Sequence, residues 1–282
     1  MKIEPYILKA LFSKSSYSYF QKESKTIHFE TWLAKKFPEL TGDIYTTISQ
    51  NLNDKIEAII NNELAFLKEF NVNNGSVIVL KLPTTDDKKL SLVAMVGSKN
   101  FHGKIHGQIN GSIVLRNAGS TLKPLIYGLA FDKLDYSPHS MLKDIPISIL
   151  TSNNESYRPK NYDLEYWGNL TARESLACSR NIPAVSLANK IGFEKFYSYL
   201  KSIGFNHLQN PPEYYGPGIA LGTARSSLLI LARIYAGIAN KGIMLPIYFG
   251  KDNKGQPVEI GNKYKIMSEK SSYQITHILA DT

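Results

Sequence analysis

The pattern of apolar and polar positions changes along the first hundred residues. Residues 1–40 mix aromatic and polar side chains without a firm period and resemble a connecting segment. From about residue 46 to 70, apolar residues recur at helical spacing in TTISQNLNDKIEAIINNELAFLKEF, which predicts one long amphipathic helix. Two β-rich runs follow at about residues 76–97, and the polar TTDDKK between them predicts a hairpin.

From about residue 119 the pattern becomes helical, after a Gly-punctuated loop, FHGKIHGQINGS. Thr171 and Glu174 have the spacing of a capping box before an apolar run, and Pro183 suits the first turn of the next helix. Gly192 and Gly204 stand where helix ends are expected.

The run TARSSLLILARIYAGIANKG predicts a further helix, with Thr223 as its N-cap and Gly242 beyond its end. Two strands followed by many helices indicate an α+β domain whose sheet is incomplete within these residues.

Composition limits the classes of protein. With 43% hydrophobic and 11% aromatic residues in 282, the chain can bury one large core or two smaller ones. Its longest apolar run, SSLLILARIYAGIA, is interrupted by Arg233, and the first residues build no apolar core of a signal peptide, so a membrane-spanning or signal segment is not predicted. The single Cys178 excludes an internal disulfide framework.

The net charge of +9 is scattered along the chain without a dense basic block. Nucleic acid, an anionic membrane and an anionic cell-wall polymer are all compatible partners for such a surface. Charge alone does not choose among them.

The segment NAGSTLKPLIYGLAF contains a Ser-x-x-Lys pattern at Ser120 and Lys123. The same pattern occurs at residues 140–143 and 198–201, so the spacing alone is what chance yields, and a helix cap or a solvated helix face explains most such matches. Ser120 differs by its context, since it follows Gly119 and opens a helix whose first turn accepts Pro124. Because residues three apart share a helix face, the Lys123 amine is expected beside the Ser120 hydroxyl.

A serine nucleophile needs a nearby base. A lysine amine serves only if its pKa falls from about 10.4 toward 7, which costs roughly 4 to 5 kcal/mol. The apolar run PLIYGLAF could bury Lys123, and Ser179-Arg180-Asn181 offers a second hydroxyl and an amide at a junction between predicted helices.

Four segments in order, GSTLKPLIYGLAFD, YRPKNYD, ARESLACSRNIPAVSLANKIG and GIALGTARSSLLILARIYAGIANKG, resemble the transpeptidase domain of class A penicillin-binding proteins. VGSKNFHGKIHGQINGSIVLRNAGSTLKP most resembles the penicillin-binding protein 1C subgroup. The resemblance implies the penicillin-binding protein and serine β-lactamase-like transpeptidase fold, here its helical part plus an N-terminal β-hairpin. It also implies a linker over residues 1–44, after a glycosyltransferase domain, and a partial transpeptidase domain over residues 45–282.

The resemblance also implies roles for individual residues. Ser120 corresponds to the acylated nucleophile and Lys123 to its general base. Ser179 and Asn181 correspond to the second motif, with Arg180 at its variable middle position. The implied reaction is attack on the D-Ala-D-Ala carbonyl of a peptidoglycan stem peptide, release of the last D-Ala, and transfer of the acyl group to an amine of a neighbouring stem.

The implied partners are stem peptides, β-lactams as inhibitors that acylate the same serine, and other cell-wall synthesis proteins. No cofactor, no metal and no nucleic acid is implied. The full-length family works at the periplasmic face of the bacterial inner membrane.

The family's third motif, Lys-Thr-Gly, is not found, because no Lys-Ser or Lys-Thr pair is followed by glycine. In the family that strand follows a helix, and YQITHILADT resembles that helix, so we expect truncation, with an unpaired edge and an uncovered apolar face on the hairpin. A non-catalytic remnant or binding module is therefore the alternative. A β-lactamase-like hydrolase is less well supported, since no deacylating glutamate is evident.

Four further residues have simpler interpretations. His102 and His106 are four apart, but Gly103 and Gly107 favour a loop over a metal-binding helix. Cys178 is expected to be a small packed side chain. Arg180 is expected to be solvated rather than to meet a substrate carboxylate.

Overall fold

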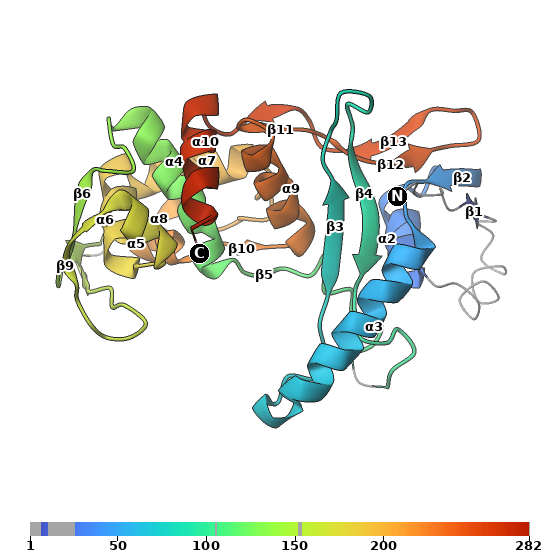
Figure 1. The fold of residues 1–282 in the computed structure, drawn as a ribbon, viewed down its shortest axis with the longest axis horizontal. Helices are drawn as coiled ribbons and strands as arrows, with labels where there is room; N and C mark the ends of the chain where they lie inside the picture. Colours follow the sequence, from blue (N-terminus) through green and yellow to red (C-terminus); the bar gives the residue numbers. More distant parts are fainter. Residues whose placement is uncertain (1–6, 11–25, 105, 152–153, 282) are drawn as a thin grey trace. The chain divides into compact units, whose positions relative to one another are not determined.

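The computed structural model describes residues 7–10, 26–104, 106–151 and 154–281 (Figure 1). The chain forms two compact units, and each is assembled from three separate stretches. The first unit comprises Met1–Val114, Ser227–Arg233 and Leu245–Asn262. The second unit comprises Leu115–Ser226, Ile234–Met244 and Lys263–Thr282.

The first unit contains a six-stranded sheet of order β1-β2-β12-β4-β3, with β13 also paired to β12 (Figure 1). Its strands are β1 (Ile7–Ala10), β2 (Gly42–Thr46), β3 (Val77–Lys81), β4 (Leu90–Val96), β12 (Ile247–Lys251) and β13 (Pro257–Ile260). The predicted hairpin is confirmed as the antiparallel β3–β4 pair. The β12–β4 pair is parallel and brings together Ile247 and Leu90, which are far apart in the sequence.

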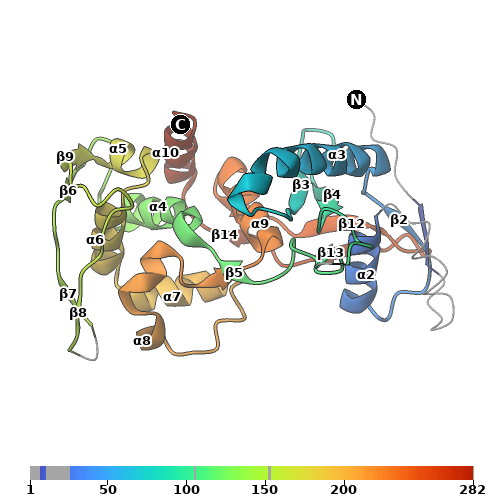
Figure 2. The same ribbon diagram turned by 90° about the horizontal axis from the view of Figure 1, so that it is seen from below.

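The hairpin has the unpaired edge that the sequence suggested, but not the uncovered face on β4. Every residue of β4 is buried, since β4 has a strand on each side. Among the described residues β3 pairs only with β4, so the expected unpaired edge is present. The expected uncovered face was wrong for β4, because helix α3 (Gln50–Phe66) packs against it (Figure 2).

Helix α3 is shorter than the predicted segment from 46 to 70. It begins after Ser49, whose hydroxyl accepts a hydrogen bond from the Leu52 N–H at 3.3 Å, and it ends in a 3-10 turn, η1 (Leu67–Phe70). The apolar spacing that predicted it brings a row of aliphatic side chains onto β4, which is the physical reason for the helix. The row and its partners are Ile56, Ile60, Leu64, Ala94 and Val96.

Residues 1–40 contain a helix that the sequence pattern did not indicate. Helix α2 (Ile27–Lys36) places Phe29 and Trp32 against Phe249 of β12, with a centroid distance of 5.1 Å between the Trp32 and Phe249 rings. Phe37 joins the same cluster. Aromatic contacts with a strand more than 200 residues later stabilise this helix, and no local period reveals them.

The second unit is mainly helical. Its helical segments are η2 (Gly119–Leu122), α4 (Lys123–Lys133), α5 (Ala172–Ala177), α6 (Asn181–Ile191), α7 (Phe193–Ser202), α8 (Pro212–Tyr215), η3 (Gly216–Leu221), the last part of α9 (Leu228–Ala239) and α10 (Glu269–Leu279). Short antiparallel ladders join β5 (Arg116–Asn117) to β10 (Arg225–Ser226), β6 (Met141–Asp144) to β9 (Gly168–Thr171), β7 (Ile149–Leu150) to β8 (Ser156–Tyr157), and β11 (Ile243–Met244) to β14 (Tyr264–Lys265).

Helix α4 lies at the centre of this unit and packs against α6 and α10. Four of its residues, Leu125, Ile126, Tyr127 and Ala130, are at most 1% exposed. Gly128 lets α10 and its preceding loop approach, because a Cβ there would lie 2.6 Å from Met267 Cε. The predicted final helix is confirmed as α10.

Most predicted helix boundaries are confirmed. Thr171 and Glu174 form a capping box at the start of α5. Pro183 lies in the first turn of α6, and Gly192 is its C-cap. Gly204 follows α7 with a φ of 118°, a value that favours glycine.

The predicted N-cap Thr223 was wrong. Strand β10 separates it from α9, which begins at Leu228. The hydroxyl of Ser227 accepts a hydrogen bond from the Ile230 N–H at 3.3 Å and takes the capping role. The predicted class, α+β with an incomplete sheet, is the class observed. None of the helices in the described ranges is long and apolar enough to cross a bilayer.

Candidate active site

Ser120 lies in the turn η2, immediately before α4, and its side chain is exposed. This turn rests on the backbone of residue 222, since the Gly119 N–H donates to the Gly222 carbonyl at 3.3 Å. A Cβ on Gly222 would lie 2.0 Å from the Gly119 nitrogen, and both glycines have positive φ angles of 59° and 81°. Only glycine at 222 permits this approach, so the position of the Ser120 turn depends on it.

Lys123 begins α4 and is 1% exposed. Its ammonium Nζ donates three hydrogen bonds, all to the segment 179–181: to the Ser179 carbonyl, to Ser179 Oγ at 3.1 Å and to Asn181 Oδ1 at 2.7 Å. The structure therefore brings Lys123, Ser179 and Asn181 together. Ser120 is not one of these hydrogen-bond partners; it lies three residues earlier at the same helix end.

The pKa of Lys123 is lowered from 10.5 to about 8, mainly by burial and to a smaller extent by the positive charge of Arg180. The burial that the apolar run PLIYGLAF suggested is thus confirmed. With that pKa, about a tenth of the Lys123 side chains are neutral at pH 7 and could accept a proton.

Asn181 is the first residue of α6, and its side-chain amide is fixed at both ends. Its Nδ2 donates to the Lys160 carbonyl at 2.8 Å, so its Oδ1 faces the Lys123 ammonium. Ser179 has a φ of 53°, which is uncommon for a residue with a side chain. This backbone conformation directs both the carbonyl and the hydroxyl of Ser179 to the same amine.

Arg180 corrects the sequence analysis, because its side chain is buried rather than solvated. It is 5% exposed, and its Nε donates to Asp144 Oδ2 at 2.8 Å. Its Nη1 donates to Asp163 Oδ2 at 2.6 Å, and its Nη2 to the Glu165 carbonyl at 2.6 Å. The guanidinium also stacks 4.2 Å from the centroid of the Trp167 ring.

Two residues behind the site were missed by the sequence analysis. Asp144 is 0% exposed and also accepts hydrogen bonds from Asn161 Nδ2 at 2.7 Å and the Trp167 N–H at 3.1 Å. Asn161 in turn accepts from the Asn181 N–H at 2.9 Å. The one signal available was that Asn161 lies in YRPKNYD, a segment that resembles the family; nothing marked Asp144.

The arrangement suits acyl transfer. An exposed serine hydroxyl stands at the start of a helix, and three residues later a buried amine with a lowered pKa meets a second hydroxyl. The two histidines considered for metal binding lie in the loop between β4 and β5, and His106 has a φ of 57°. Within the described residues, no group of three or more His, Cys, Asp or Glu side chains is arranged to hold a metal ion.

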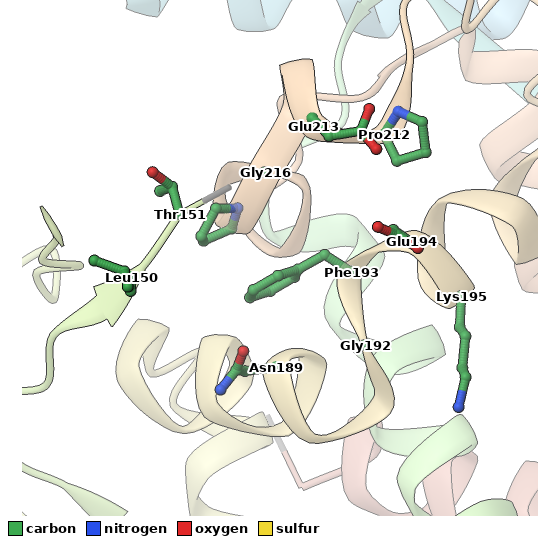
Figure 3. Close-up of a pocket in the computed structure, with 11 residues that line it drawn as sticks. Leu150, Thr151, Asn189, Gly192, Phe193, Glu194, Lys195, Pro212, Glu213 and Gly216 are labelled. Carbon is green, nitrogen blue, oxygen red and sulfur yellow. The ribbon is translucent and has the colours of Figure 1, made fainter. Parts of the chain in front are cut away.

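A cavity of about 350 Å³ also lies in this unit and includes none of the predicted site residues. The ring of Phe193 points into it, with Asn189 of α6 on one side and Leu150 and Thr151 on another (Figure 3). The remaining lining residues are Gly192, Glu194, Lys195, Pro212, Glu213, Gly216 and Pro217.

Comparison with known proteins fits this geometry. The family model described as penicillin binding protein transpeptidase domain matches residues 84–281. The chain therefore belongs to the family of penicillin-binding protein transpeptidase domains.

The relatives place it with the class A proteins of that family. It is 28% identical over 228 residues to penicillin-binding protein 1A of Neisseria cinerea, covering 74% of this chain and 28% of that protein. It is 31% identical over 204 residues to penicillin-binding protein 1F of Bacillus subtilis, covering 69% and 26%. It is 27% identical over 233 residues to penicillin-binding protein 1B of Vibrio cholerae, covering 82% and 29%. The chain thus spans less than a third of these relatives.

Solved structures show the same fold. Penicillin-binding protein 1A from Haemophilus influenzae matches with a TM-score of 0.59 at 24% identity, over 73% of this chain and 35% of that one. A peptidoglycan synthetase from Bifidobacterium adolescentis matches with a TM-score of 0.64 at 15% identity, over 85% and 47%.

Proposed function

We propose that this chain carries the acylation centre of a peptidoglycan D,D-transpeptidase, with Ser120 as nucleophile. The observation that carries the proposal is the buried Lys123 amine, which has a lowered pKa and is bound by Ser179 and Asn181. Family membership supports the same assignment.

In the proposed acylation, the neutral Lys123 amine takes the Ser120 Oγ proton as Oγ bonds to the penultimate D-Ala carbonyl carbon. The tetrahedral intermediate collapses, the peptide C–N bond breaks, and the leaving D-Ala amine receives the proton through the Ser179 hydroxyl. Asn181 holds the Lys123 ammonium and a substrate amide. An amine of a neighbouring stem peptide then displaces Ser120 from the acyl group and completes the cross-link.

The proposed partners follow from this reaction. They are stem peptides ending in D-Ala-D-Ala, β-lactams as inhibitors, and other cell-wall synthesis proteins, at the periplasmic face of the inner membrane. We assign the transpeptidase domain to residues 45–282. The segment from Val96 to Pro124 supports placement in the 1C subgroup.

A second candidate is a non-catalytic binding module. It is supported by one observation: no Lys-Thr-Gly or Lys-Ser-Gly occurs in these 282 residues. In the family that strand contributes an oxyanion donor, and loss of one such donor slows acylation about 100- to 1,000-fold. The two candidates therefore differ in whether Ser120 reacts at all.

Intact-mass measurement after incubation with a penicillin tests the choice. We expect one covalent adduct on the unaltered chain, none on Ser120→Ala, and an unchanged adduct on Ser198→Ala. Ser198 is a matched control, because it also stands three residues before a lysine but lies exposed on α7. An adduct that survives Ser120→Ala would refute the assignment. A folded chain that forms no adduct would favour the binding module.

A further inference from the structure

The segment 179–181 is held from behind by an ionic cluster in which Arg180 and Asp144 are buried and Asp163 is exposed. The Arg180 guanidinium makes four interactions in this cluster. It pairs with the carboxylates of Asp144 and Asp163, donates to the Glu165 carbonyl and lies over the Trp167 ring. A planar guanidinium that donates in three directions fixes its own backbone more firmly than a lysine could.

Asp144 is the hub of the cluster. Its Oδ1 accepts from Asn161, and its Oδ2 accepts from both Arg180 and the Trp167 N–H. Because Asp144 is 0% exposed, its charge depends on these partners. Loss of the Arg180 cation leaves the Asp144 carboxylate uncompensated in the interior, whereas loss of Asp144 leaves Arg180 with Asp163 as its remaining carboxylate.

Asn161 connects the ionic cluster to the start of α6, because it donates to Asp144 and accepts from the Asn181 N–H. The first N–H groups of a helix lack partners within it, and the N-cap residue here, Arg180, makes no capping side-chain hydrogen bond. Asn161 Oδ1 takes that place and accepts from the Asn181 N–H at 2.9 Å and the Ile182 N–H at 3.4 Å. The cluster therefore fixes the backbone on both sides of the bond between residues 180 and 181.

The neighbouring residue needs such support. Ser179 has a φ of 53°, and a non-glycine residue in that region costs on the order of 1 kcal/mol unless its surroundings hold it there. Arg180 is the adjacent residue and is anchored by two carboxylates. If that anchor loosens, the Ser179 carbonyl and hydroxyl lose their direction toward Lys123.

We propose that Arg180 is a positioning residue for acylation, acting with Asp144 and Asn161 to hold Ser179 and Asn181 against the Lys123 amine. This inference rests on the proposed function. None of the three touches the reacting atoms; each acts through the residues that do.

The charge of Arg180 adds an electrostatic effect on Lys123. Arg180, on the loop before α6, is the charged group that acts on the amine, and it is itself paired with Asp144 on β6 and Asp163 on the loop between β8 and β9. Burial raises the pKa of Tyr127 on α4 and keeps it neutral. Removing the Arg180 cation removes a cause of the lowered Lys123 pKa and leaves the Asp144 carboxylate unbalanced. Loss of the Arg180 cation raises the pKa of Lys123, so the neutral amine needs a higher pH.

The test measures the rate of penicillin acylation as a function of pH, with the adduct detected by intact mass. In the unaltered chain the rate rises with a midpoint near pH 8. Arg180→Gln shifts the midpoint upward by about one pH unit. Arg180→Lys keeps the charge without the three-way anchor, so its midpoint stays near 8 while its plateau rate falls about tenfold or more.

Arg173→Gln is the matched control. Arg173 also pairs with a carboxylate, Asp281, in the same unit. It lies near the N-terminal end of α5, whereas Ser179 follows the C-terminal end of that helix. Its replacement by glutamine removes the same charge as Arg180→Gln. We expect neither midpoint nor plateau to change. If Arg180→Gln behaves like Arg173→Gln, or if Arg180→Lys keeps the plateau rate of the unaltered chain, the proposal is overturned.

Two further measurements keep the result decisive. Should Arg180→Gln fail to fold, the double variant Arg180→Gln/Asp144→Asn removes the buried pair together, and its midpoint is still expected above that of the unaltered chain. Carbon-13 NMR of Lys123 Cε reads the amine's pKa without any β-lactam. An increase in that pKa in Arg180→Gln would support the electrostatic effect of Arg180 on the amine even if no adduct forms, whereas an unchanged pKa would refute that effect.

Discussion

At the residue scale, the site depends on the amine of Lys123, which is buried away from solvent. Lys123 is 1% exposed, and its three hydrogen bonds all go to Ser179 and Asn181. Its lowered pKa means that the folded chain binds fewer protons than the unfolded chain between pH 8 and 10.5. Stability conferred at this position therefore increases with pH across that window, and below it the cost of the buried charge is constant.

Lys123→Met makes this cost measurable. The free energy of unfolding of the unaltered chain, minus that of the variant, should increase by about 2 kcal/mol between pH 7.5 and 9.5. Urea denaturation at each pH gives both values, and groups other than Lys123 cancel in the difference. A difference that stays constant or falls with pH would contradict a lowered pKa at Lys123.

At the element scale, the turn η2 and the residue that follows η3 approach each other closely at Gly119 and Gly222. Gly222→Ala should move the Ser120 turn, because the new Cβ would lie 2.0 Å from the Gly119 nitrogen. We expect penicillin acylation to slow about 100-fold. Gly255→Ala is the control: its φ of 78° is close to that of Gly222, at 81°, but no atom lies within 4 Å of a Cβ there. Equal effects on acylation in both variants would show that backbone strain, not the close contact, is responsible.

Helix α10 is joined to α4 by one carboxylate. Asp132 accepts hydrogen bonds from the Ser268 N–H at 2.8 Å, from Ser268 Oγ at 2.6 Å and from Ser271 Oγ. Removing an acceptor of this kind costs about 1 to 3 kcal/mol. Asp132→Ala should therefore accelerate amide hydrogen exchange throughout α10.

A matched acid is available for comparison. Glu269 pairs with Lys241 in an exposed contact, and exposed pairs contribute about 0 to 1 kcal/mol. Glu269→Ala should leave the exchange of α10 nearly unchanged. If both variants accelerate exchange equally, the Asp132 contacts are not what holds the helix.

At the scale of the whole molecule, both units are discontinuous in sequence. Strand β4 is buried along its length and pairs with β12, which begins at Ile247. Residues 26–114 alone would expose the edge and part of the face of β4. We expect this fragment to give an unfolded or aggregated product, seen as loss of dispersion in a proton–nitrogen NMR spectrum. A well-dispersed spectrum would show that β12 and β13 are dispensable for the sheet.

The same discontinuity explains what the sequence could and could not predict about the fold. The β3–β4 hairpin was predictable, because its two strands and its polar turn are neighbours. The strands β2 and β12 were missed, since each is short and pairs with a strand that is distant in sequence. Strand β13 was missed although its partner, β12, is adjacent in sequence, because both strands are short. Helix α2 was missed for the same reason, as its burial depends on Phe249.

The site divides along similar lines. Spacing, helix context and resemblance together pointed to Ser120, Lys123, Ser179 and Asn181, and the last three share hydrogen bonds. The environment of Arg180 was predicted wrongly, because its carboxylate partners come from positions 36 and 17 residues earlier. No periodic pattern relates an arginine to acids at such separations, so their burial together becomes evident only in three dimensions.

The unusual backbone at Ser179 has a consequence for anyone who engineers this domain. Glycine adopts a φ of 53° without strain, so a search for heat-resistant variants would favour Ser179→Gly. That replacement would also delete the hydroxyl 3.1 Å from the Lys123 amine. Ser179→Gly should therefore raise the melting temperature and lower the reaction rate. A screen that measures only the melting temperature would select a variant with reduced activity.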